Sequence, residues 1–232
     1  MRVEVVPPGM QIIVGIIFKI AVILFSAILH EVAHGAVALR LGDATAKMAG
    51  RLTLNPLRHL DPFGSIILPL MLTLFGGPPF GYAKPVPYNP YNFKDSRKGS
   101  LIVGLAGPLT NFVLAALFAV AIRVMVLSDM QDFGGGSLIV AFVAIMFINI
   151  ILGIFNLIPI PPLDGSKALF YFFPRLEPMF ARFGPVLFFL LIFWIAPNIV
   201  GPLAALSLNL AFDQATYEAV IPLIEQYRYL LF

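Results

Sequence analysis

Two histidines and a glutamate lie close together in an otherwise apolar stretch near the start of the chain. His30, Glu31 and His34 form the pattern H-E-V-A-H within residues 24–39. Residues four apart share one face of an α-helix, so both imidazoles can bind one metal ion while Glu31 approaches a water on that ion from the side. Two histidine ligands with a carboxylate general base are typical of zinc hydrolases. Three titratable groups in a membrane helix would otherwise be very costly.

Two other classes of protein compete with the zinc hydrolase. H-x-x-x-H alone is common by chance, but the added Glu31 makes a random match in a chain of this size improbable. A metal- or proton-coupled transporter would bury the same ligands, although such proteins usually show repeated halves with paired broken helices, and no repeat is visible here. A catalytically inactive membrane scaffold would not need Glu31, because metal binding alone does not require that carboxylate. The hydrolase is therefore the leading hypothesis and the transporter the alternative.

The composition indicates a membrane protein. Of the 232 residues, 59% are hydrophobic and 12% charged, and that charged share is about half the share in a soluble domain. Long apolar runs predict membrane spans at residues 12–41, 100–127 and 138–160. The net charge of +3 does not indicate nucleic-acid binding, because the few basic residues fall in loops where they orient the protein in the bilayer. There is no cysteine, so a metal must be held by nitrogen and oxygen ligands.

The predicted fold is an all-α polytopic membrane protein with a three-helix catalytic core in residues 1–165. A short apolar run at residues 64–76 is marginal for a full span, so it is predicted to re-enter the membrane or to form a short sheltered helix. Alternating side chains predict a short β-strand over residues 48–55. Prolines make residues 80–90 extended, either as a strand that pairs with a substrate peptide or as a surface loop. Residues 166–232 should add hydrophobic helices, as one kinked span or two short helices, with a tail at the membrane interface.

The third metal ligand must come from elsewhere in the chain. His59 is the remaining histidine, so the ligand is either His59 or a carboxylate. The loop after the first span and the loop before the second span are basic, whereas the loop around Asp129 has no lysine or arginine, which places the basic loops on the cytosolic side. The proline-rich turn that carries Asp164 then lies on the same side as the C-terminal half of the first span. This topology favours Asp164 as the third ligand.

Four motifs, in this order, resemble those of the site-two protease family of intramembrane zinc metalloproteases. They are H-E-V-A-H at residues 30–34, the stretch from Asn55-Pro56 to Asp61-Pro62-Phe63-Gly64 with His59, G-P-L-T-N at residues 107–111, and N-L-I-P-I-P-P-L-D-G at residues 156–165. The last motif is much more specific than H-E-x-x-H alone. The resemblance covers most of residues 20–175, and its spacing suits the family's core of three helices.

The resemblance implies one Zn²⁺ per chain, held by His30, His34 and Asp164, with Glu31 as the catalytic base. It also implies that Asn111 is the family's intramembrane asparagine near the zinc, with a role in substrate positioning or oxyanion support.

His59 has a weaker claim as a loop residue that orders or gates the site. Together with Asn111 and Asn156, it is expected to lead water to the site from the cytosol. The chain resembles a minimal form, without the PDZ or CBS domain that some relatives carry.

The predicted function is that of an intramembrane zinc metalloendopeptidase. It would hydrolyse peptide bonds within or near transmembrane segments of single-span membrane proteins, as in regulated intramembrane proteolysis. If the hydrocarbon begins near Lys19, His30 lies about 16 Å from either end of the first span, inside the bilayer. The expected location is a cell membrane, as a multi-pass protein with its site towards the cytosolic side, and the lack of cysteine suits a prokaryote. The expected partners are these substrates and the lipid bilayer, without nucleic acid; the sequence does not define an oligomeric state.

Overall fold

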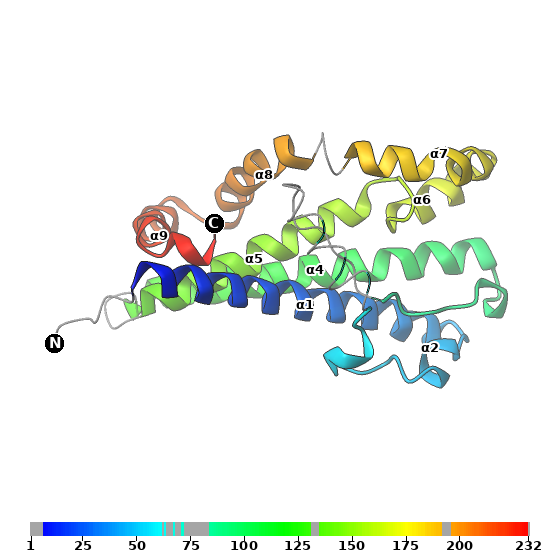
Figure 1. Ribbon diagram of the computed structural model, residues 1–232, viewed down its shortest axis with the longest axis horizontal. Coiled ribbons are helices and arrows are strands. Elements are labelled where there is room, and N and C mark those ends of the chain that lie inside the picture. Colours follow the sequence, from blue (N-terminus) through cyan, green and yellow to red (C-terminus); the bar gives the residue numbers. More distant parts are fainter. Residues whose placement is uncertain are drawn as a thin grey trace. The chain divides into compact units, whose positions relative to one another are not determined.

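The computed structural model describes residues 7–61, 63, 67, 71, 84–130, 135–191 and 196–231. In this part of the chain the regular structure is helical, without a β-strand (Figure 1). The helices, with η for the 3-10 type, are α1 (Pro8–Arg40), α2 (Thr45–Met48), η1 (Pro56–Arg58), η3 (Pro90–Asn92), α4 (Ser96–Leu127), α5 (Gly135–Leu157), α6 (Gly165–Phe172), η5 (Pro174–Leu176), α7 (Glu177–Leu190), α8 (Ala196–Ala211), α9 (Gln214–Gln226) and η7 (Arg228–Leu230).

Three of the described helices are long and apolar enough to cross a membrane: Gly9–Arg40, Ser96–Leu127 and Gly135–Leu157. The shortest has 23 residues, which rise about 35 Å and exceed the ~30 Å of a bilayer's hydrocarbon core. Large apolar side chains of α1 such as Ile13 and Ile17 are 58% and 62% exposed, which suits contact with lipid. The protein is thus an all-α polytopic membrane protein, as the sequence predicted, and the three predicted spans correspond to α1, α4 and α5.

The short strand predicted over residues 48–55 is wrong. Helix α2 ends at Met48, Gly50 then takes a left-handed conformation with φ of 64°, and the chain bends on to η1. Met48 and Leu54 are 79% and 56% exposed, so the alternation does not correspond to a buried face. A strand also needs a neighbouring strand for its backbone groups, and the described residues provide none.

The other predicted irregular segments have mixed outcomes. The run at residues 64–76 lies outside the described residues, apart from Ile67 and Met71, and so do residues 80–83. Residues 84–89 are non-helical, as their prolines predict. In the C-terminal region, the alternative with two short helices agrees with α7 and α8.

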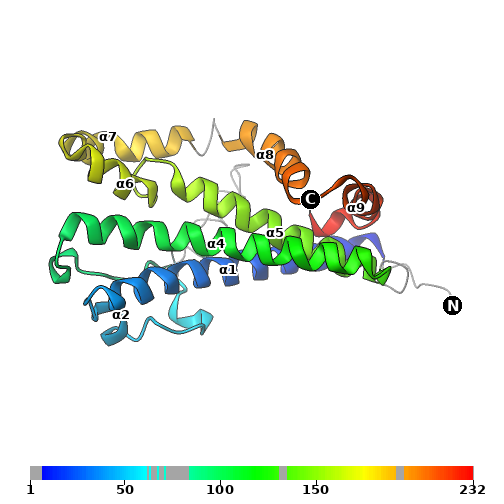
Figure 2. The ribbon, with the colours of Figure 1, turned by 180° about the vertical axis from the view of Figure 1, so that it is seen from behind.

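The chain divides into two compact units. Unit 1 comprises Met1–Ile23, Val113–Ile150 and Pro202–Phe232, and unit 2 comprises Leu24–Phe112 and Ile151–Gly201. In unit 1, α9 lies across the ends of α4 and α5 (Figure 2). The apolar core of that unit consists of Ala115, Ile122, Met125, Val126, Ile139, Val143, Met146, Phe212 and Val220.

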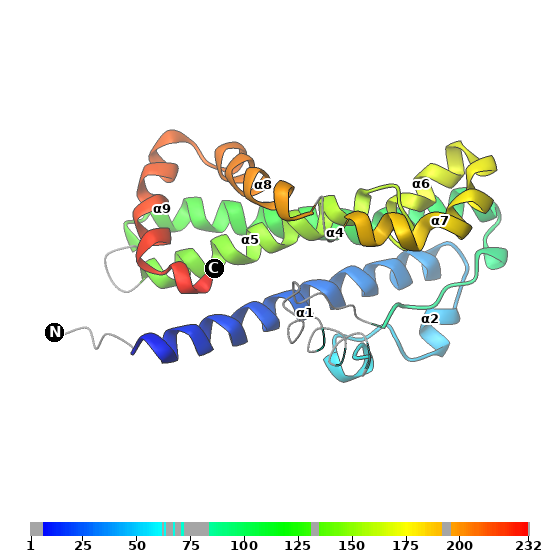
Figure 3. The same ribbon diagram turned by 45° about the horizontal axis from the view of Figure 1, so that its top comes forward.

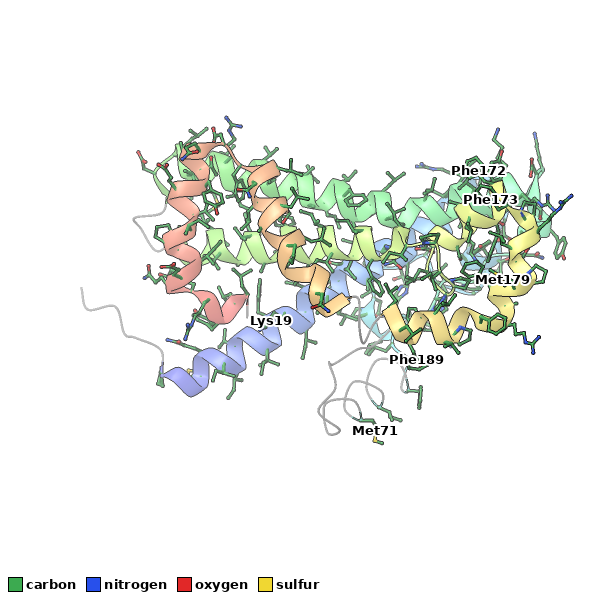
Figure 4. The ribbon with its side chains drawn as sticks, turned by 90° about the horizontal axis from the view of Figure 1, so that it is seen from above. Lys19, Met71, Phe172, Phe173, Met179 and Phe189 are labelled. Carbon is green, nitrogen blue, oxygen red and sulfur yellow. The ribbon has the colours of Figure 1, made fainter. Side chains whose placement is uncertain are left out.

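Unit 2 contains the predicted site, and its α6 and α7 present apolar side chains outwards. Phe172 of α6, Phe173 directly after it, and Met179 and Phe189 of α7 are between 47% and 67% exposed and project from the surface (Figure 4). This exposure is consistent with a lipid-facing surface, because large apolar side chains are normally buried in a soluble domain.

Candidate metal centre

The two histidines of the H-E-V-A-H motif face the same way from the C-terminal half of α1. His30 and His34 are only 6% and 7% exposed. Their rings meet edge to face with centroids 4.7 Å apart, as expected for residues one helical turn apart. Together with the Glu31 carboxylate, they offer three candidate metal-ligand atoms that lie within 4.8 Å of one another.

Asp164 reaches the same point from the turn between α5 and α6. Its Oδ2 lies 3.0 Å from Nε2 of His30 and 3.1 Å from Nε2 of His34. The carboxylate is separated from His30 by 134 residues of chain and from His34 by 130, so the fold creates this cluster. The structure therefore brings together the three side chains expected as ligands.

The second nitrogen of each imidazole, Nδ1, forms a hydrogen bond with an oxygen acceptor. Nδ1 of His30 lies 2.5 Å from Oδ1 of Asn111, and Nδ1 of His34 lies 2.7 Å from the backbone oxygen of Val103. These oxygens can only accept, so each Nδ1 carries the hydrogen and each neutral ring directs the lone pair of Nε2 towards Asp164. Fixing a ligand's tautomer through its second nitrogen is how proteins orient metal-binding histidines.

This donor set fits a zinc ion. In the neutral tautomers, two Nε2 lone pairs and a carboxylate oxygen face one another with no hydrogen between them, which is unfavourable unless a cation lies among them. Tetrahedral zinc with bonds of about 2.0–2.1 Å separates its ligand atoms by about 3.3 Å, close to the 3.0 and 3.1 Å found here. Nitrogen and oxygen ligands also suit zinc in a chain without cysteine.

Helix α4 passes so close to these atoms that a side chain would fill the centre. A Cβ atom added at Gly107 would lie against Nε2 of both His30 and His34. Glycine at this position therefore keeps open the space in which an ion would lie. The same helix supplies Asn111 one turn later, and that side chain is fully buried.

Glu31 is held at the edge of the cluster by a different part of the chain. Its Oε2 accepts a hydrogen bond of 2.7 Å from the backbone N–H of Val86. A carboxylate beside the ligands and oriented by a donor can accept a proton from a nearby water. A general base requires this position beside the ligand atoms, and the general-base role of Glu31 stays a prediction.

The two remaining candidate residues are not part of this cluster. His59 is fully buried, and its Nε2 lies 2.8 Å from the backbone oxygen of Thr53. Its Nδ1 has no hydrogen-bond partner in the described part of the protein. Asn156 donates to the backbone oxygen of Leu152 in its own helix at 2.9 Å.

Sequence reasoning missed several groups that shape the centre. The carbonyl of Val103 and the amide of Val86 are backbone groups, which have no signature in the residue type. Gly107 begins the G-P-L-T-N motif, but only the packing shows that a side chain there would fill the metal site.

Comparison with known proteins identifies the family. The model of peptidase family M50 matches residues 18–134 and 124–196. The chain is 39% identical over 154 residues to YwhC of Bacillus subtilis, which is provisionally named a zinc metalloprotease; the match covers 66% of this chain and 67% of YwhC. No solved structure matches.

Two further relatives carry the same provisional name of zinc metalloprotease. Rip2 of Mycolicibacterium smegmatis is 37% identical over 162 residues, which is 70% of this chain and 58% of Rip2. MJ0611 of Methanocaldococcus jannaschii is 33% identical over 165 residues, which is 70% of this chain and 73% of MJ0611. The matches thus span between 58% and 73% of the length of these relatives.

These features define a membrane protein of the zinc metalloprotease class. The chain belongs to peptidase family M50, the site-2 protease family, as the motifs predicted. Zinc is the metal of this class, and the cluster of unit 2 has the ligand types to hold one ion.

Proposed function

We propose that this protein is an intramembrane zinc endopeptidase that cleaves single-span membrane proteins within or near their transmembrane segments. The observation that supports this most strongly is the meeting of His30, His34 and Asp164 beside Glu31 on a helix of membrane-spanning length. Buried polar groups are costly in a bilayer. Metal ligands on a membrane-spanning helix therefore support a function inside the membrane, which a soluble zinc peptidase would not require.

Each residue of the centre has a distinct role in this proposal. His30, His34 and Asp164 would hold the ion, and zinc, when bound, supplies the Lewis acidity that acidifies water and polarises a peptide carbonyl. Glu31 accepts the proton of the attacking water and afterwards donates it to the leaving amine. The hydrogen bond from Val86 leaves the carboxylate oriented for this transfer.

Asn111 contacts one of the predicted metal ligands, His30. Its amide oxygen accepts from Nδ1 of His30, so it holds that ring in the tautomer that binds metal. This contact supports a ligand-orienting role in addition to the substrate-positioning or oxyanion role that the family resemblance implies.

The location of the centre on α1 bears on the substrate. His30 lies ten residues before the end of α1 at Arg40, or about 15 Å along the helix axis. The basic residues that follow, Arg40, Lys47 and Arg51, favour a cytosolic side for this end in a cell membrane. A substrate helix must unwind locally before its peptide bond can reach the centre, because helical hydrogen bonds hide the backbone.

Residues 84–89, the described part of the extended segment, have few free backbone N–H donors for a substrate strand. Pro85 and Pro87 have no N–H, and three of the four other residues of 84–89 already donate within the protein, at Lys84, Val86 and Asn89. Pairing with a peptide would therefore depend mainly on carbonyl oxygens. For these six residues the surface-loop alternative is better supported than strand addition.

The experiment that tests the proposal is cleavage of a panel of tagged single-span substrates by the purified full chain, with zinc content determined in parallel. Glu31→Gln should keep about one zinc per chain and lose activity by a factor on the order of 10² to 10⁴, the usual contribution of a general base. Glu177→Gln, at an exposed position in α7, is the matched control and should cleave like the wild type.

Other outcomes would redirect the interpretation. If wild type and Glu31→Gln both hold zinc and neither cleaves any member of a varied panel, a metal- or proton-coupled transporter gains support. If carefully prepared wild type holds no zinc, the ligand assignment itself is wrong.

A further inference from the structure

We infer that the segment Lys84–Asn92, called the strap here, positions the catalytic carboxylate of Glu31 through the backbone N–H of Val86, and that Asp43 fixes the strap in place. The inference rests on the proposed function, since it assigns positioning groups to the base of that reaction. The hydrogen bonds described below for Val86 and Asp43 do not involve His30, His34 or Asp164.

The strap contacts α1 beside the metal centre. The N–H of Val86 donates to Oε2 of Glu31 at 2.7 Å. The side chain of Val86 is 5% exposed, and its Cγ1 would lie 2.8 Å from a Cβ atom added at Gly35. Gly35 is one helical turn after Glu31, so a glycine there allows the strap to approach α1 at the position of the base. Figure 3 shows the blue-green connection running beside the C-terminal half of α1 towards the start of α4.

Both ends of the strap are fixed to other parts of unit 2. At its start, the N–H of Lys84 donates to the backbone oxygen of His59 at 2.8 Å. At its end, the N–H of Asn89 donates to Oδ2 of Asp43 at 2.7 Å, and Nδ2 of Asn92 donates to Oδ1 of Asp43 at 2.6 Å. The position of the Val86 amide is therefore determined from both sides.

Asp43 is a buried carboxylate whose hydrogen bonds serve this connection. It is 0% exposed and also accepts from the N–H and hydroxyl of Thr45, at 3.1 and 2.5 Å. The described residues include no Lys, Arg or His in an ion pair with it. A buried carboxylate without hydrogen bonds would be strongly unfavourable, and the donors present here are the strap and the residue that begins α2.

The sequence of the strap stiffens its backbone. Pro85 and Pro87 flank Val86 and restrict the chain to extended conformations. Tyr88 stacks on Phe93 and packs against the small apolar cluster of unit 2, which consists of Ala38, Phe93 and Val103. Little conformational freedom is left between the two anchored ends, so the Val86 amide is oriented before any substrate arrives.

A donor at this position matters because glutamate is a flexible side chain. Glu31 has three rotatable torsions, and catalysis by a general base requires the carboxylate within hydrogen-bond reach of the proton it accepts. One fixed N–H selects a single orientation of the carboxylate beside the ligand atoms. The expected signature is a loss in kcat without a matching change in KM or zinc content.

The first experiment removes the donor while keeping an extended backbone. Val86→Pro deletes the N–H, and Val86→Ala keeps it while shortening the side chain. We expect Val86→Pro to lower kcat by a factor on the order of 10 to 100, as for loss of a hydrogen bond to a charged group. KM should change less than about threefold and zinc should stay near one per chain, while Val86→Ala retains several times the kcat of Val86→Pro.

The second experiment tests whether Asp43 acts through the same contact. Asp43→Asn places an amide group where the strap presents N–H donors, and should lower kcat severalfold in the wild-type background. In the Val86→Pro background it should cost clearly less, because the contact it supports is already absent. If kcat of the double variant falls by the product of the two single-variant factors, Asp43 acts by another route.

A third measurement does not need cleavage. Thermal unfolding of the full chain in detergent is compared for Glu31→Ala, Val86→Pro and the double variant. If the hydrogen bond exists, the double variant loses less stability than the sum of the two single variants, since it leaves no partner unpaired. Strict additivity would overturn the contact even if no substrate were cleaved.

The outcomes separate this inference from the proposed function. A wild type that holds zinc and cleaves nothing contradicts the endopeptidase, and the thermal cycle still decides the strap contact. A cleaving wild type with unchanged or increased kcat in Val86→Pro contradicts the positioning role while leaving the endopeptidase intact.

Discussion

The two compact units of this protein use the same three long helices in opposite ways. In unit 1, α4, α5 and α9 pack through a buried apolar cluster that includes Ile122 and Val220, and the described ion pair of that unit, between Arg123 and Asp213, is largely exposed. In unit 2, the described residues bury His30, His34, Asp43, Arg51, His59 and Asn111. Unit 1 also buries Asn149, Ser207 and Thr216, but among the described residues the buried side chains that can carry a charge all lie in unit 2.

This difference shows what each unit contributes. Apolar packing stabilises a membrane bundle without orienting particular atoms, because dispersion contacts are weakly directional. Hydrogen bonds to carboxylate, imidazole and amide groups fix both distance and direction. Unit 1 is thus suited to holding helices together and unit 2 to holding a metal centre, and variants in the two units should separate stability from activity.

The largest effect is expected at Gly107. A methyl group there would lie against both Nε2 atoms, so Gly107→Ala should abolish zinc binding and cleavage while leaving the protein folded, since alanine is a better helix former than glycine. Metal analysis and circular dichroism of the purified variant check this. Gly9→Ala, where an added Cβ meets nothing within 4 Å, is the matched control; zinc retained in Gly107→Ala would contradict the site.

A substitution that creates a cavity in unit 1 should lower stability and leave zinc binding nearly unchanged. Ile122 is fully buried in the apolar cluster, and Ile122→Ala should destabilise the protein by about 2–5 kcal/mol with little change in zinc affinity. Thermal unfolding and zinc titration on the same sample measure both quantities. Val124→Ala, at a residue 55% exposed on the same helix, should be nearly neutral. A loss of zinc affinity in Ile122→Ala would show that the two units are not separable.

Buried asparagines allow a direct comparison between the units. Asn111 accepts from His30, whereas Asn149 in unit 1 donates to the backbone of its own helix at Ile145. Asn111→Ala should weaken zinc affinity by about 10- to 100-fold, as for other partners of metal-bound histidines. Asn149→Ala should leave it unchanged. Competition with a chelator gives the zinc affinity of each variant. Equal affinities in the two variants would show that Asn111 does not support the metal centre.

The smallest expected effect is the pH dependence of the stability that Asp43 contributes by holding the strap. Burial raises the pKa of Asp43, but the hydrogen bonds from Thr45, Asn89 and Asn92 outweigh it, and the pKa is lowered overall. A lowered pKa in the folded state gives stability that is complete above the unfolded value near pH 4 and is lost as the pH falls through the folded value. The difference in unfolding midpoint between wild type and Asp43→Asn should therefore be constant from pH 8 to about 5 and shrink in stronger acid. A difference that grew in acid would contradict this account.

Local patterns in the sequence determined the three spans and half of the metal centre. Hydropathy depends on composition within a window, so α1, α4 and α5 could be predicted to within a few residues. His30, Glu31 and His34 are neighbours on one helix, and their geometry follows from helical periodicity. Asp164 required an argument about loop charge and topology, and the structure places it beside both histidines. The strand over residues 48–55 failed because short alternation does not distinguish a strand from a bent, exposed loop.

Only the tertiary structure could decide how these residues are held. The carbonyl of Val103, the amide of Val86 and the space at Gly107 belong to the backbone, and the type of a residue does not reveal where its backbone groups point. Asp43 and the strap are separated by more than 40 residues of chain, so no local pattern connects them. Side-chain chemistry and periodicity are written in the sequence, whereas the directions that orient a general base and its metal ligands arise from packing between distant segments.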